Sequence, residues 1–202
     1  MGLFEKLFGG GKKRIPRDTA ETRGVHMPDL KLPADEKFTI YFKQNGGKFI
    51  YCDSQKDISD ALSNIILENR WQDQAFFSLD QRLEHKFSKE DILFTNNVKD
   101  SNVFFTTCEH LIAQNGSILV SSNQLKEKRL NELPDNFIVF ATTSQLVESI
   151  GEGLKNIKKK HTNIPDNITT IKHFLSTPEN KNDFLSYGST SKNLYLLLLE
   201  DY

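Results

Sequence analysis

Residues 108–141 read CEHLIAQNGSILVSSNQLKEKRLNELPDNFIVFA and contain the pattern that decides the fold. A short apolar patch at 111–113 is expected to be helical, and it meets the polar turn 114–117, Gln-Asn-Gly-Ser. A strand over 118–121 leaves that turn, and a later apolar run at 137–141 predicts a second, buried strand. Because α/β proteins usually place their binding sites where buried strands end in polar turns, this stretch also predicts a site.

The rest of the chain repeats this alternation of apolar strands and amphipathic helices. Helices are expected after the capping residues Asp35, Ser54 and Ser144, and the pair Gly46-Gly47 is expected to end the first of them. In the third helix the apolar residues recur three or four positions apart: Leu146, Val147, Ile150, Leu154 and Ile157. Further strands are expected at 48–52, 75–79, 92–95, 103–106, 168–174 and 194–199. The pattern predicts a single three-layer α/β domain over 38–202, with a mainly parallel sheet and helices on both faces.

The polar turn supplies the candidate ligand-binding residues Asn115, Gly116 and Ser117, and Arg129 follows the next strand. Glycine permits a positive φ and a close approach of ligand to backbone, while Asn115 and Ser117 offer amide and hydroxyl groups. A phosphate or carboxylate could then lie over exposed N–H groups, with Arg129 supplying positive charge. The alternative is a tight turn that only closes a strand, with Arg129 solvated on a surface loop, because Asn-Gly is first of all a turn signal.

Composition excludes several classes of protein. The net charge of −1 offers no electrostatic footprint for nucleic acid. The two cysteines, Cys52 and Cys108, are far apart in sequence, which argues for a reducing compartment and against a disulfide scaffold, a zinc ribbon or an iron–sulfur cluster. No apolar run is long enough to span a bilayer, and MGLFEKLFGGGKKR lacks the features of a signal peptide. A cytoplasmic protein without metal or cofactor is expected.

Residues 1–34 differ in composition from the rest of the chain. They hold three consecutive glycines, three consecutive basic residues and three of the six prolines, which predicts a flexible tail. A short amphipathic segment at 3–8 places four apolar residues on one helical face: Leu3, Phe4, Leu7 and Phe8. That face could contact a membrane surface or a partner protein, or it could be a frayed terminus or dock on its own domain.

Motifs that carry chemistry are sparse. Cys108, Glu109 and His110 are adjacent, but adjacent residues on a strand or helix do not converge on one point. His161 and His173 are too isolated to complete a metal set with them. No catalytic residue is predicted, and a binding protein is expected rather than an enzyme.

Four features of residues 38–202 match a known family: Lys48-Phe49-Ile50 after a Gly-Gly helix end, Ile112 to Ile118, Arg129-Leu130 with Leu133-Pro134, and a last strand ending in Leu199-Glu200. They resemble the lactate-utilization (LUD-domain) family, which typically has Thr-Gly-Thr where this chain has Asn115-Gly116-Ser117. The family also typically has a Gly-Pro-Ser-Arg-Thr-Ala-Asp-Ile-Glu run before its last strand. This chain has Ser176-Thr177-Pro178-Glu179-Asn180 there, without the Gly-Pro start, the arginine or the Asp-Ile pair.

The resemblance implies a fold similar to the ribose-phosphate isomerase and CoA-transferase group. It also implies an accessory role in lactate or carboxylate utilization, with iron–sulfur redox subunits of a lactate oxidation system as partners. Two alternatives stay open. One is a scaffold or interaction module that has lost the ligand site, and the other is a small-molecule enzyme of the isomerase or CoA-transferase type.

Overall fold

The computed structural model describes residues 32–160, 162–172 and 192–201. Its helices are α2 (Ala34–Gln44), α3 (Gln55–Asn69), α4 (Gln81–Lys86), α5 (Ser122–Leu125) and α6 (Ile150–Lys160). Its strands are β1 (Lys48–Cys52), β2 (Ala75–Phe77), β3 (Leu93–Thr95), β4 (Val103–Thr107), β5 (His110–Ile112), β6 (Ser117–Val120), β7 (Asn136–Thr142), β8 (Leu146–Val147), β9 (Thr169–Ile171) and β10 (Asn193–Leu199).

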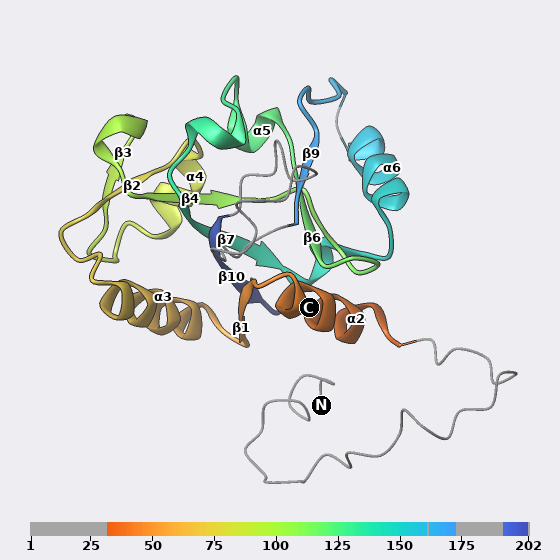
Figure 1. Cartoon of the computed structure of the whole chain (residues 1–202), viewed down its shortest axis with the longest axis horizontal. Helices are drawn as coiled ribbons and strands as arrows, with labels where there is room; N and C mark the ends of the chain where they lie inside the picture. The colour runs from red at the N-terminus through yellow and green to blue at the C-terminus, as the bar shows by residue number, and fades with distance from the viewer. Residues whose placement is uncertain (1–31, 161, 173–191, 202) are drawn as a thin grey trace, which may run out of the picture. The chain divides into compact units, whose positions relative to one another are not determined.

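Six strands form one sheet in the order β1-β10-β7-β4-β2-β3, and every neighbouring pair in it is parallel (Figure 1). The carboxyl ends of all six strands therefore meet at one edge of the sheet, where open α/β folds bind their ligands. The prediction of an α/β domain with a mainly parallel sheet is confirmed.

Side chains of the central strands alternate between two apolar cores. In β7, Phe137 and Val139 pack on one face of the sheet, and Ile138 and Phe140 pack on the other. The first face is covered by α2 together with a second sheet, and the opposite face is covered by α3 and α4. These are the three layers of the domain, and the uniformly apolar strands are explained by burial on both faces.

The second sheet was not predicted. It contains four strands in the order β8-β5-β6-β9, and β5 pairs with β6 as an antiparallel hairpin. The expected helical patch at 111–113 is therefore wrong, because Leu111 and Ile112 lie in β5 and pair with Ile118 and Ser117. A three-residue apolar run has no readable period, and pairing across the Asn-Gly turn decided its conformation.

The helix expected after Ser144 begins later in the structure. Leu146 and Val147 form β8, which pairs with β5, and α6 starts only at Ile150. The Ser149 hydroxyl accepts a hydrogen bond from the backbone N–H of Glu152, and this contact helps to begin the helix. Helix α6 then packs on the second sheet through a small core: Ile112, Leu119, Val147 and Ile157.

Helix ends follow local chemistry with one exception. Ser54 caps α3 by accepting from the N–H of Asp57, as predicted. Helix α2 ends before Gly46, which has φ +88°. Its N-cap, however, is Pro33 and not Asp35, so the helix starts two residues earlier than expected.

Several expectations lie outside the described residues. They are the amphipathic segment at 3–8, nearly all of the predicted tail 1–34, the end of the strand expected at 168–174, and the region after Ser176. Within the described ranges, no helix has the length and apolar character needed to cross a membrane.

Candidate functional site

The predicted turn packs tightly against helix α2. The side-chain amide of Asn45 donates to the carbonyl oxygens of Asn115, at 2.8 Å, and Gly116, at 3.3 Å. Gly116 has φ +65°, and a Cβ built there would lie 2.3 Å from the backbone nitrogen of Phe42. The turn thus uses glycine for a close approach of two backbones.

Three hydrogen-bond donors of this turn have partners within the protein. The Gly116 N–H donates to the Ile112 carbonyl at 2.9 Å, and the Ser117 N–H donates to Asn115 Oδ1 at 3.1 Å. The Ser117 hydroxyl donates to the same oxygen at 2.7 Å, and Ser117 is fully buried. These contacts give the turn a packing role, and anion binding at it stays a prediction.

Arg129 is separated from the turn along the chain by β6 and α5. Its side chain is exposed, and its backbone N–H donates to the Glu132 carboxylate at 2.7 Å. Ser117 begins β6, and α5 follows the other end of that strand. The turn and the segment that contains Arg129 therefore follow from opposite ends of β6.

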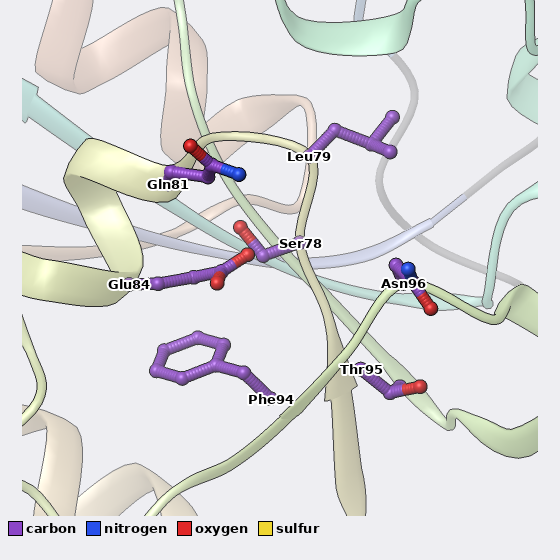
Figure 2. Close-up of a pocket in the computed structure, with 7 residues that line it drawn as sticks. All are labelled: Ser78, Leu79, Gln81, Glu84, Phe94, Thr95 and Asn96. Carbon is purple, nitrogen blue, oxygen red and sulfur yellow. The ribbon is translucent and has the colours of Figure 1, made fainter.

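A cleft of about 460 Å³ lies at the carboxyl ends of β2 and β3, beside α4 (Figure 2). We call it the β2–β3 cleft, and it is lined by Ser78, Leu79, Gln81, Glu84, Phe94, Thr95 and Asn96. The Ser78 N–H donates to the Thr95 carbonyl at 3.1 Å and joins the two strand ends. Gln81 and Glu84 are three residues apart and therefore share one face of α4. Figure 2 shows the Glu84 carboxyl group pointing toward the Ser78 hydroxyl.

A second cleft, of about 520 Å³, lies between the α5 segment and the loop before β9. We call it the α5–β9 cleft, and it is lined by Ser122, Lys126, Glu127, Lys128, Asp166 and Asn167. The Ser122 N–H donates to the Asp166 carbonyl at 2.9 Å and joins the two walls. The ammonium of Lys128 lies 5.9 Å from the centre of the Phe77 ring, at the carboxyl end of β2.

The α5–β9 cleft also contains unusual backbone. Among the described residues other than glycine, positive φ occurs at Arg70, Lys126 and Asn167, and the last two line this cleft. Lys126 has φ 53° and ψ −125°, a conformation that an L-residue adopts at a cost of about 1–3 kcal/mol. Such conformations concentrate at ligand sites. The cleft volume and the positive-φ backbone therefore both make this cleft a candidate ligand site.

The thiols are not placed for nucleophilic chemistry. Burial, with smaller effects from Asp57 and Asp53, raises the pKa of Cys52 to about 11. Cys108 is buried, and desolvation together with Glu109 raises the pKa of its thiol strongly. Both thiols are therefore protonated near neutral pH, and neither lines the two clefts.

Glu109 and His110 form hydrogen bonds with neighbouring segments of the protein. The Glu109 carboxylate accepts hydrogen bonds from the Ser121 hydroxyl at 2.7 Å and the Asn123 amide at 2.7 Å, which fixes the start of α5. His110 Nδ1 lies 3.1 Å from the Gln145 carbonyl oxygen. Among the described residues, no group of three histidine, cysteine or acidic side chains is arranged to hold a metal ion.

Asp201 joins the carboxyl ends of β10 and β7. Its carboxylate accepts from the Thr143 hydroxyl at 2.7 Å, and from the N–H and hydroxyl of Ser144 at 2.8 and 2.6 Å. Desolvation raises the pKa of this carboxyl, but the hydrogen bonds from Ser144 and Thr143 outweigh it and lower the pKa to about 2.

Replacing Asp201 by asparagine should remove a pH-dependent part of stability. Because the folded pKa lies below the usual 3.8, the contribution is present above about pH 4 and is lost as the pH falls toward 2. Since Asp201 is exposed, we expect only about 1 kcal/mol at neutral pH. Urea unfolding between pH 7 and pH 3 measures it, with the exposed Asp73→Asn as control. Equal pH slopes for wild type and Asp201→Asn would contradict this role.

The two clefts were missed because their residues are not adjacent in sequence. Lys126 and Asn167 are far apart along the chain and meet because β9 pairs with β6. The β2–β3 cleft joins the ends of two parallel strands with a helix. A signal was present in the basic segment 126–129, but only Arg129 was considered, either as positive charge for the Asn115-Gly116-Ser117 turn or as a solvated residue on a surface loop.

Comparison with known proteins agrees with this architecture. The family model of the LUD domain matches residues 36–199. A crystal structure of a DUF162 family protein from Deinococcus radiodurans is similar, with a TM-score of 0.57 at 12% identity, covering 84% of this chain and 99% of that one. That likeness concerns the fold alone, and no curated protein matches the chain. Since the family model spans most of the sequence, the chain belongs to the LUD-domain family.

Proposed function

We propose that this LUD-domain protein is a non-catalytic accessory protein of lactate or related carboxylate utilization, which binds a small hydroxy acid. One observation supports the binding site above all. The α5–β9 cleft brings Lys126 and Lys128 together with hydroxyl and amide groups, on backbone of positive φ.

The lining suits both ends of a 2-hydroxy acid. Two ammonium groups complement a carboxylate, and Lys is a common donor to such anions. The carboxylates of Glu127 and Asp166, and the amide oxygen of Asn167, can accept a hydrogen bond from the neighbouring hydroxyl group. A simple anion would use only the lysines, so the mixed lining favours an acid that also carries a hydroxyl.

The non-catalytic part rests on the side chains that line the clefts. Hydride or proton abstraction from a hydroxy acid needs a base and an electron acceptor beside the substrate. Among the described residues, the side chains that line the α5–β9 cleft are a hydroxyl, carboxylates, ammonium groups and an amide, none of which accepts electrons, and both cysteines of the chain are buried elsewhere with raised pKa. Electron transfer would therefore belong to partners, for which the family resemblance suggests iron–sulfur redox subunits. Contact with a partner or a membrane surface through Leu3, Phe4, Leu7 and Phe8 is part of the same proposal, as is a cytoplasmic location.

Calorimetric titration tests the proposal. We expect L-lactate to bind wild type with a millimolar or lower dissociation constant, and its neutral analogue lactamide to bind much more weakly. The double variant Lys126→Ala/Lys128→Ala should lose about tenfold or more in affinity, because charge-assisted hydrogen bonds contribute about 1.5–3 kcal/mol each. The matched control is Lys155→Ala/Lys158→Ala on the exposed side of α6, which should bind as wild type does.

The two alternatives predict different results. A scaffold that has lost its ligand site would show no heat with lactate in any variant. An enzyme would reduce a dye acceptor in the presence of lactate, or would convert a sugar phosphate or CoA ester, without a partner protein. Lactate binding without turnover supports the accessory role.

A further inference from the structure

The β2–β3 cleft has a lining that differs from that of the α5–β9 cleft. Its side chains are two hydroxyls, two amides, one carboxylate, an aromatic ring and a leucine. Among the described residues that line the cleft there is no lysine, arginine or histidine. A volume of about 460 Å³ lies in the usual range for small-molecule sites.

Two basic side chains of α4, those of Arg82 and Lys86, make contacts with residues that do not line this cleft. Arg82 donates to Asp80 with Nε and Nη2, both at 3.2 Å, and its side chain is 92% exposed. The Lys86 ammonium lies over the Phe140 ring, 5.0 Å from its centre. An anionic ligand would therefore meet the Glu84 carboxylate without a counter-charge from the lining, which is unfavourable.

The hydrogen-bonding groups can serve a ligand with several hydroxyls. The Ser78 oxygen accepts from the Asp80 N–H at 3.3 Å, and the Thr95 oxygen accepts from the Asn97 N–H at 3.1 Å. Each hydroxyl keeps its own proton to donate. The amides of Gln81 and Asn96 both donate and accept, and the Glu84 carboxylate accepts.

Phe94 supplies an apolar wall. Its ring stacks on Phe105, with centroids 6.2 Å apart and planes inclined by 15°, which fixes its orientation. An aromatic wall in a cleft that is also lined by polar groups suits a ring-shaped molecule with one face of C–H groups and hydroxyls at its edge.

From these contacts we infer that the β2–β3 cleft binds an uncharged, hydroxyl-rich molecule of monosaccharide size. Glu84 and Gln81 on α4 bind hydroxyls from one side, Ser78, Thr95 and Asn96 bind them from the strand ends, and Phe94 packs on the ring. This site is separate from the hydroxy-acid site and does not depend on it.

The test is an NMR titration of the full-length, ¹⁵N-labelled protein. The probes are D-glucose and myo-inositol, with gluconate as the anionic and glucosamine as the cationic counterpart. Glucose or inositol should shift the backbone amides of Ser78, Glu84, Thr95 and Asn96 saturably. Glu84→Gln should weaken this binding about five- to tenfold, because one charge-assisted hydrogen bond becomes neutral. The control Glu68→Gln, on the exposed side of α3, should change nothing.

Three results would overturn the inference. One is the absence of saturable shifts with both neutral sugars at tens of millimolar. Another is tighter binding of gluconate than of glucose. The third is glucosamine binding that exceeds glucose binding and vanishes in Glu84→Gln, which would assign the cleft to a cation. The Lys126→Ala/Lys128→Ala variant should bind glucose normally, so failure of the lactate proposal does not affect this result.

Discussion

Replacing Gly116 by valine should destabilise the domain by about 3 kcal/mol or more. A φ near +65° destabilises a residue other than glycine by about 1–2 kcal/mol, and a β-branched residue by more. The new Cβ would also lie 2.3 Å from the Phe42 nitrogen and 2.4 Å from the Tyr41 carbonyl carbon. Those atoms belong to the backbone of α2, so relief requires the helix to move, at a further cost of about 1–3 kcal/mol.

Gly151→Ala is the matched control. Gly151 has an ordinary φ in helix α6, and a Cβ there would meet no atom closer than Ser149 Oγ at 3.8 Å. Alanine is the better helix former, so this variant should be neutral or slightly more stable. Urea unfolding followed by circular dichroism compares the two. Equal stabilities for Gly116→Val and wild type would show that the turn does not pack on α2 as described.

Replacing Lys192 by methionine should cost about 3 kcal/mol. Lys192 is only 1% exposed, and its ammonium donates to the carbonyls of Leu133 and Pro134, at 3.0 and 3.1 Å, and to the Asp135 carboxylate at 3.2 Å. Methionine keeps the apolar stem but donates nothing, and each buried carbonyl left without a partner costs about 1–3 kcal/mol.

The exposed Lys155 provides the comparison, since Lys155→Met removes the same charge without burying an unpaired group. Chemical unfolding should separate the two variants by about 3 kcal/mol. If both behaved alike, the contacts of Lys192 would add nothing to stability, and the link between the segment before β7 and the start of β10 would have to come from the sheet alone.

Local sequence patterns predicted the helices and strands whose conformation is decided by residues within one short segment. Strand β7 is apolar at five successive positions, which predicts a buried strand, and it is buried on both faces. Helix α3 has the Ser54 cap, a periodic apolar face and a polar opposite face, and it begins directly after Ser54 as expected. The family resemblance pointed to the same architecture.

The strands of the second sheet depend on pairing between segments far apart in the sequence, so local sequence patterns did not predict them. Leu111, Ile112, Leu146 and Val147 are apolar in any conformation, and they became strands because they pair with each other in the second sheet. Both clefts arise in the same way, from segments brought together by strand order. The predicted Asn115-Gly116-Ser117 turn was visible as a turn, whereas its contact with α2 depends on tertiary packing.

The most direct test of the proposed function is a titration of the ¹⁵N-labelled protein with L-lactate, observed by NMR at each backbone amide. The proposed function predicts saturable shifts that centre on the α5–β9 cleft, at Ser122, Lys126, Lys128 and Asn167. It also predicts that lactate stays chemically unchanged in the sample. Saturable shifts centred on Asn115, Gly116 and Ser117 instead, or no shifts at tens of millimolar lactate, would contradict it.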